Sequence, residues 1–104
     1  MYLGIDCGTQ GTKALVLDAG SGQVLGAGSA SHTLLSAANG RREQQPQQWL
    51  EAFEQATAQA LAAAGIRGER ILGIGVSGQQ HGLVLLDEQG AVLRPAKLWC
   101  DTES

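Results

Sequence analysis

A short apolar run at the start of the chain ends on the carboxylate of Asp6 and leads into a turn of glycines and hydroxyl-bearing residues. The chain then resumes as a second apolar run at residues 14–18. Two apolar runs joined by a short polar stretch predict a β-hairpin. Gly8 and Gly11 give its tip backbone freedom and let a ligand come close to the main chain. The sequence therefore predicts a hairpin with an open tip.

The tip carries groups of a kind that can bind a phosphate. Backbone N–H groups that converge in a tight turn form an anion-binding nest, and Lys13 adds a positive charge. Thr9, Gln10 and Thr12 add side-chain donors. Asp6 can hold or orient a hydrated Mg²⁺. An ordinary glycine-rich hairpin turn would also fit this pattern, so the stretch alone leaves both interpretations open.

The length of 104 residues and a hydrophobic content of 43% indicate one globular domain. The net charge is −3 and the seven lysines and arginines are scattered, which argues against a nucleic-acid partner. No stretch approaches the roughly 18 apolar residues of a membrane span. Asp6 interrupts the first apolar run, so we also expect no secretory signal peptide.

The two cysteines, Cys7 and Cys100, lie far apart in strand-like settings. We expect two buried free thiols, as in a reducing cytoplasm, with a disulfide as the alternative. His32 and His81 have no spacing that suits zinc beside them. The sequence therefore favours a cytoplasmic protein without a zinc site.

The next segments predict a meander followed by a helix. Residues 24–31 form a third strand weakened by glycines, and residues 32–45 are irregular. The helix opens at Pro46 and stops at Gly65. We expect Trp49 to be a core residue. The stripe that packs on the sheet consists of Trp49, Leu50, Phe53, Ala56, Thr57, Ala60, Leu61 and Ala64.

Three more strands follow in the prediction. Residues 71–77 are a continuous apolar run, typical of a strand that is covered on both faces and parallel to the first. Residues 82–87 and 92–99 form two further strands around a turn at residues 87–90. The glycines of residues 73–78 match the dinucleotide-binding pattern, but they lie inside a strand and no helix follows, so we exclude that function.

Two polar stretches near the ends of these strands suit a sugar. Gln80 and His81 stand between glycines, where amide and imidazole groups can hydrogen-bond hydroxyls. Trp99 offers an aromatic face and Asp101 a carboxylate. A solvent-exposed turn and a core tryptophan are the structural alternatives for the two stretches.

Several of these stretches together resemble a known family. Residues 6–13 are similar to the first phosphate motif of the sugar-kinase, Hsp70 and actin superfamily. The chain as a whole resembles the FGGY carbohydrate kinases, and within them the bacterial xylulokinases. The shared segments are that motif, Glu-Gln-Gln-Pro with Trp49, Gly-Gln-Gln-His-Gly, and Leu-Trp-Cys-Asp. The resemblance implies an α/β fold, a ribonuclease-H-like lobe with a mixed sheet, an antiparallel meander and a packed helix.

The resemblance also implies a function. Residues 1–104 would be the N-terminal part of an ATP- and Mg²⁺-dependent kinase that converts D-xylulose to D-xylulose 5-phosphate in pentose catabolism, with a homodimer as one possible assembly. The general base and the adenine site would lie beyond residue 104, so the chain alone would be inactive. Asp6 would be needed for activity. The nucleotide phosphates would face Gly8, Thr9, Gln10, Gly11, Thr12 and Lys13, and the sugar would contact Gln80, His81, Trp99 and Asp101.

Two alternatives remain open at this point. One is another FGGY sugar or polyol kinase, such as a ribulokinase, glycerol kinase or gluconokinase. The other is a sugar-sensing module without catalysis on the same fold. A sensor has no reason to keep a metal-binding carboxylate beside a phosphate turn, which favours a kinase.

Overall fold

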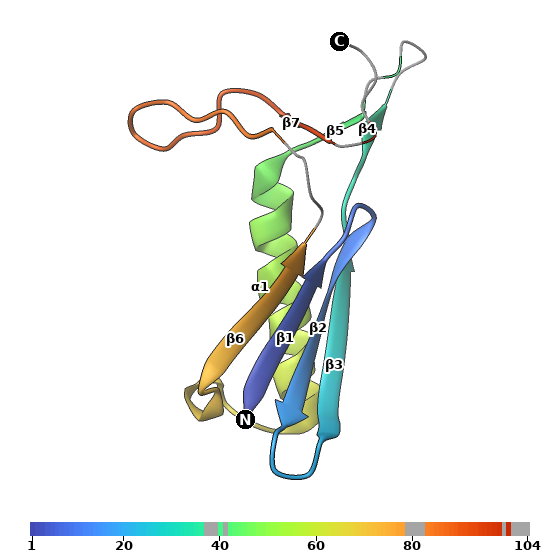
Figure 1. Ribbon diagram of the computed structural model, residues 1–104, viewed down its shortest axis with the longest axis vertical. Helices are drawn as coiled ribbons and strands as arrows, with labels where there is room; N and C mark the ends of the chain where they lie inside the picture. Colours follow the sequence, from blue (N-terminus) through green and yellow to red (C-terminus); the bar gives the residue numbers. More distant parts are fainter. Residues whose placement is uncertain (37–39, 41, 79–82, 99, 101–104) are drawn as a thin grey trace.

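The main sheet has four strands and lies against helix α1 (Figure 1). The computed structural model describes residues 1–36, 40, 42–78, 83–98 and 100. Three antiparallel strands come first: β1 (Tyr2–Cys7), β2 (Gly11–Asp18) and β3 (Gln23–Ser31). β6 (Gly73–Gly78) then lies parallel to β1, which gives the order β3-β2-β1-β6. The predicted hairpin, meander and parallel strand are confirmed.

Helix α1 (Pro46–Ala64) begins and ends as predicted, with Pro46 in its first turn and Gly65 at its end. Gly65 has a φ of 70°, a conformation that favours glycine. The predicted stripe is right for Ala56 and wrong for Leu50, which is 68% exposed. At 100° per residue, Leu50 lies about 120° around the helix from Ala56, away from the sheet. The buried residues of α1 are Pro46, Ala52, Ala56 and Ala60.

Glycines of β3 lie directly under α1. A Cβ atom at Gly28 would lie 2.3 Å from the carbonyl oxygen of Ala56, and one at Gly26 would lie 2.4 Å from that of Ala60. No side chain fits at such distances. The sequence predicts that these glycines weaken the strand, whereas in the structure they let the helix backbone approach the sheet.

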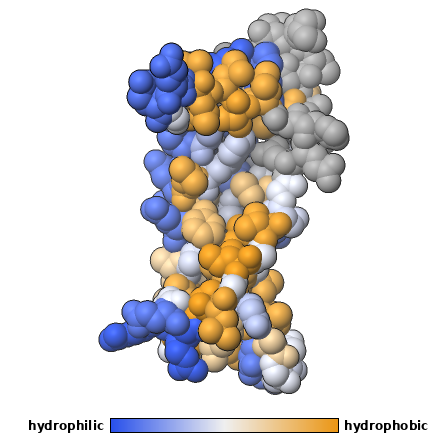
Figure 2. Space-filling view, turned by 60° about the vertical axis from the view of Figure 1, so that its left-hand side comes forward, coloured by the Kyte–Doolittle hydropathy of each residue, from blue (hydrophilic) through white to orange (hydrophobic). Residues whose placement is uncertain are grey.

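β6 is exposed, although the sequence predicts that both its faces are covered. Ile74 and Val76 are 55% and 70% exposed. Helix α1 packs mainly on β3 and β2, and in the described part of the chain no second α-helix covers β6. Figure 2 shows hydrophobic surface on this side of the molecule. The core beneath α1 consists of Leu3, Ile5, Ala14, Val16, Ala56 and Ala60.

A small second sheet lies beyond the tip of the β1–β2 hairpin (Figure 1). It contains β4 (Leu35–Ser36), β5 (Arg42–Gln44) and β7 (Ala96–Lys97), in the order β4-β5-β7. The prediction of an irregular segment at residues 32–45 is therefore wrong at β4 and β5. Both strands are only two or three residues long, too short to show a hydrophobic periodicity. They pair with each other, and β5 also pairs with β7, which is distant in the sequence.

The segment after β6 is less regular than predicted. The described residues of the two expected strands at 82–87 and 92–99 form isolated bridges, Leu83 with Lys97 and Leu86 with Val92, and regular pairing is confined to β7. The expected turn is present, since the N–H of Gly90 donates to the carbonyl oxygen of Asp87 at 3.0 Å. A short 3₁₀ helix, η1 (Gly68–Arg70), precedes β6. The predicted pair of full strands is wrong.

Cys7 and Cys100 are free thiols, as predicted. Both are half-buried rather than fully buried, and Cys100 lies in a turn rather than in a strand. In the part of the chain that the structure describes, no helix is long and apolar enough to cross a membrane.

Candidate functional site

The turn between β1 and β2 has the two residues Thr9 and Gln10 at its tip. The N–H of Gly8 donates to the carbonyl oxygen of Gly11 at 2.9 Å, which closes the turn. Neither glycine has a positive φ. A Cβ atom at Gly11 would lie 2.7 Å from the carbonyl oxygen of Ala30, so glycine is needed there to let β3 come close.

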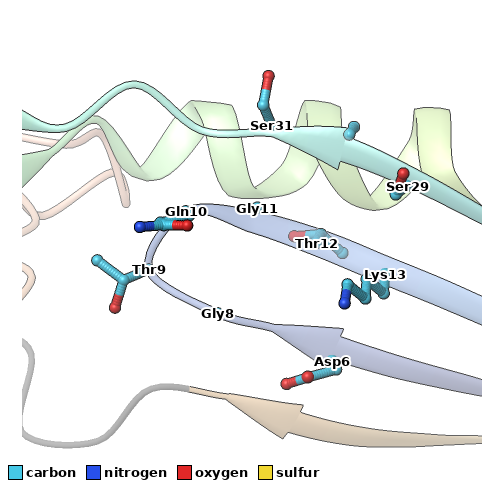
Figure 3. A pocket seen from close by; sticks show the side chains of 10 residues that line it. Asp6, Gly8, Thr9, Gln10, Gly11, Thr12, Lys13, Ser29 and Ser31 are labelled. Carbon is cyan, nitrogen blue, oxygen red and sulfur yellow. The ribbon is translucent and has the colours of Figure 1, made fainter.

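An open cleft of about 560 Å³ lies over this turn. Clefts of this volume are in the usual range for small-molecule sites. Figure 3 shows that the side chains of Asp6 and Lys13 come from neighbouring strands and project into the same space. The structure thus brings together every residue that the sequence predicts for the phosphates and the metal. The cleft is lined by Asp6, Gly8, Thr9, Gln10, Gly11, Thr12, Lys13, Ser29, Ala30 and Ser31.

Asp6 has a polar setting on the face of the sheet that α1 leaves open. Its side chain is exposed, it pairs across the sheet with Lys13 of β2, and on its other side it pairs with Ser77 of β6. The Ser77 hydroxyl donates to Asp6 Oδ1 at 3.5 Å, a long contact. A carboxylate, an ammonium group and a hydroxyl therefore lie side by side on three neighbouring strands.

The single carboxylate of Asp6 suits a hydrated Mg²⁺ better than a metal ion whose ligands all come from the protein. The described residues contain no group of three or more His, Cys, Asp or Glu side chains that could hold a metal ion. Mg²⁺ in phosphate-transferring sites is commonly held by one or two carboxylates, with water and substrate phosphates completing the shell. The exposed carboxylate of Asp6 beside the turn fits that arrangement.

Thr12 faces inward, although its hydroxyl is predicted to add a donor to the tip. The residue is 1% exposed, and a 2.8 Å hydrogen bond joins Thr12 Oγ1 to Nε2 of His32, which is also buried. The backbone N–H of His32 donates to the carbonyl oxygen of Gln10 at 2.9 Å. His32 therefore holds the turn from behind through its side chain and its backbone.

Gln44 holds the same turn from β5. This side chain is fully buried, and its Nε2 donates to the carbonyl oxygen of Thr9. Its Oε1 accepts a 2.9 Å hydrogen bond from Nε1 of Trp49, in the first turns of α1. Trp49 contacts protein through this bond, but it is half-buried and lies outside the described core cluster, so the prediction of a core residue is only partly met. Gln44 thus connects the tip of the turn to the start of the helix.

Comparison with known proteins identifies the family. A model of the FGGY family of carbohydrate kinases, N-terminal domain, matches residues 1–104. The chain belongs to the FGGY family. Xylulose kinase from Haemophilus influenzae is 56% identical over 108 residues, a match that covers 100% of this chain and 22% of that protein.

Two solved sugar kinases have a similar fold over this part of their chains. A xyloylose kinase from Brucella ovis has a TM-score of 0.89 and 42% identity, covering 97% of this chain and 21% of that one. Xylulose kinase from Rhodospirillum rubrum has a TM-score of 0.88 and 35% identity, covering 96% and 20%. The chain thus spans about a fifth of the length of these proteins. The predicted α/β fold of the sugar-kinase and actin superfamily is confirmed.

The residues predicted to bind the sugar in this FGGY domain, Gln80, His81, Trp99 and Asp101, lie outside the described residues. The described neighbours show where the chain leaves the sheet, since β6 ends at Gly78, which pairs with Cys7 next to the β1–β2 turn.

Sequence reasoning missed His32 and Gln44, which hold the turn, and the β3 residues that line the cleft, Ser29, Ala30 and Ser31. Gln44 lies in the Glu-Gln-Gln-Pro segment on which the predicted resemblance was based, which is a signal that could have pointed to it. His32 is a single histidine at the end of a strand and gives no such signal.

We expect the Thr12→Val substitution to lower the free energy of unfolding by about 1–3 kcal/mol, because it leaves buried His32 Nε2 without its partner. Urea denaturation of the chain measures the change. Thr57→Val is the matched control, since the buried Thr57 hydroxyl has no hydrogen-bond partner in the described structure. That variant should be neutral or slightly stabilised. Equal effects of the two substitutions would contradict a structural role for the Thr12–His32 bond.

Proposed function

We propose that this chain, residues 1–104, is the N-terminal part of an ATP-dependent kinase that phosphorylates D-xylulose to D-xylulose 5-phosphate in pentose catabolism, in the cytoplasm. The proposal depends on the cleft in which Asp6, Lys13 and the β1–β2 turn meet, in a chain of the FGGY family. The name xylulose kinase, which several relatives carry, supports a ketopentose as the substrate.

In this proposal the terminal phosphates of ATP lie at the β1–β2 turn. Phosphoryl transfer needs in-line positioning and compensation of negative charge more than covalent chemistry. Backbone N–H groups of the turn and the ammonium group of Lys13 suit these two tasks. Asp6 would hold Mg²⁺, which when bound supplies the positive charge that offsets the phosphate oxygens.

The sugar would lie beside the phosphates, in contact with Gln80, His81, Trp99 and Asp101. The hydroxyl that accepts the phosphoryl group must lose a proton to a base. Asp6 is the only carboxylate among the described residues that line the cleft, and we assign it to the metal. We therefore place the base and the adenine site beyond residue 104, and we expect the chain alone to be inactive.

The cleft also bears on the alternative of a sugar sensor. A sensor needs a sugar pocket and has no use for a carboxylate and a lysine beside a phosphate turn. The meeting of Asp6 and Lys13 in one cleft supports the kinase instead.

The test is ATP-dependent phosphorylation by the complete protein, measured with D-xylulose, L-ribulose, glycerol and gluconate. We expect D-xylulose to have the highest kcat/KM. The isolated chain, assayed in parallel, should form no ADP. Preference for another of these substrates would change the assigned sugar, and binding of a sugar without turnover would favour the sensor.

In the same assay, His81→Ala should lower kcat/KM for the sugar, because a polar contact to the substrate is lost. The decrease should correspond to a loss of about 1–3 kcal/mol of transition-state stabilisation. Gln55→Ala, at an exposed position on α1, is the control and should leave kcat/KM unchanged. If His81→Ala matches this control, His81 does not contact the sugar.

A further inference from the structure

We propose that strand β5 positions both halves of the site. In this inference Gln44 orients the phosphate turn, and Glu43 fixes the segment that leads to the predicted sugar-binding residues. Neither residue would touch a substrate, so both are positioning residues. The inference rests on the proposed kinase function, which assigns one half of the site to the phosphates and the other to the sugar. The contacts that support it are those made by Glu43 and Gln44 of β5.

Gln44 controls the direction of a peptide group at the tip of the turn. Its Nε2 donates to the carbonyl oxygen of Thr9, and a trans peptide points its C=O and its N–H in opposite directions. The N–H of Gln10, which belongs to the same peptide group, is therefore held pointing away from Gln44. The bond from the His32 N–H to the Gln10 carbonyl oxygen fixes the next peptide group in the same way.

The side chain of Gln44 is itself held in place. It is fully buried, and its other polar atom, Oε1, accepts the indole N–H of Trp49 at 2.9 Å. A buried amide with both ends bonded has little freedom to rotate, since any other rotamer would leave a polar group unpaired. The position of the turn is thereby tied to the first turns of α1.

Glu43 acts on the other half of the site. It is 1% exposed, forms an ion pair with Arg94, and has Lys97 Nζ at 3.2 Å from its Oε2. It also pairs with Lys97 in the β5–β7 ladder, and the N–H of Leu98 donates to the carbonyl oxygen of Arg42 at 3.0 Å. The segment at residues 94–98 is therefore fixed on β5, directly before Trp99.

The two tasks fall on neighbouring residues because successive side chains of a strand point to opposite faces. Glu43 and Gln44 can therefore reach different partners from one short strand. Replacing one side chain should disturb its own partner and spare the other, which makes the two roles separable by experiment.

The first test is steady-state kinetics of the complete protein with ATP and D-xylulose. Gln44→Met keeps the length of the side chain and removes both hydrogen bonds. It should raise KM for ATP by about tenfold, the size expected for the loss of a buried hydrogen bond, and change KM for D-xylulose by less than about twofold. Glu43→Gln removes the negative charge. It should raise KM for D-xylulose by about tenfold and change KM for ATP by less than about twofold. The controls are Gln55→Met and Glu54→Gln, at exposed positions on α1, which should change neither KM.

The second test is hydrogen–deuterium exchange of the same proteins without substrates, so it does not depend on turnover. Gln44→Met should speed exchange in the β1–β2 turn, and Glu43→Gln should speed it at residues 83–98, each sparing the other region. This pattern in a protein that phosphorylates no sugar would support the positioning roles while the proposed function fails. Uniformly faster exchange, unchanged exchange, or KM values that shift together would overturn the inference.

Discussion

Asp6→Asn in the complete protein is expected to lower kcat/KM for phosphoryl transfer by about 10²- to 10³-fold. The substitution keeps the size of the side chain and removes the charge that would hold Mg²⁺. Charge stabilisation by such a metal contributes several kcal/mol, and about 1.4 kcal/mol corresponds to a factor of ten in rate. The measurement is kcat/KM as a function of Mg²⁺ concentration, where the variant should also need more Mg²⁺ to reach half of its maximal rate.

The matched control is Asp18→Asn at the far end of β2. Asp18 Oδ1 accepts the N–H of Gly20 at 3.1 Å, a bond that the amide oxygen of asparagine can keep. This variant should retain the kinetics of the unmodified protein. If Asp6→Asn keeps more than about a tenth of the activity at every Mg²⁺ concentration, Asp6 is not the metal-binding carboxylate.

Gly28→Ala is expected to be strongly destabilising, because it adds a methyl group where β3 lies against α1. The new Cβ would lie 2.3 Å from the carbonyl oxygen of Ala56 and 2.5 Å from Cβ of Gln59. The contact involves helix backbone, which can move only if α1 shifts from β3. Overpacking of this kind costs about 1–3 kcal/mol, and we expect the upper end, about 3 kcal/mol, in urea denaturation of the chain.

The comparison is with Gly75→Ala in β6, where an added Cβ would meet no atom within 4 Å. At such a site, alanine reduces the entropy of the unfolded chain and can stabilise by about 0.4–1 kcal/mol. The two substitutions are chemically the same and should differ in sign. A Gly28→Ala protein as stable as Gly75→Ala would mean that α1 does not pack as closely on β3 as described.

The parts of the fold that the sequence predicts correctly depend on local signals. The first hairpin follows from two apolar runs around a polar turn, and the bounds of α1 follow from Pro46 and Gly65, which suit only certain positions of a helix. The parallel pairing of β6 with β1 follows from a continuous apolar run.

The errors arise where a distant partner decides the structure. Glu43 and Gln44 have the composition of a loop, but Arg94, Lys97, Thr9 and Trp49 give them partners, so they become buried. The converse holds for Ile74 and Val76, whose apolar character predicts burial but which no described helix covers. Neither outcome can be obtained from the residues themselves, because the partner is far away in the sequence.

In the candidate site, too, the residues of one contiguous segment were predicted and those from distant segments were not. The residues predicted to face the phosphates are contiguous in sequence, and the structure gathers them in one cleft with Asp6 and Lys13. The groups that hold the turn, His32 and Gln44, come from elsewhere and were not predicted. The roles assigned to Gln80, His81, Trp99 and Asp101 stay predictions, since these residues lie outside the described part of the chain.

The exposed position of β6 has a consequence for handling the protein. β6 is the last strand of its sheet, and on the side away from β1 no described strand pairs with it. Its sequence, GIGVSG, contains no charged residue and no proline, the two features by which natural edge strands avoid pairing with another chain. An isolated copy of this domain therefore presents an unprotected edge for strand addition, and a loss of soluble protein in truncated or mutated forms can reflect aggregation rather than a damaged site.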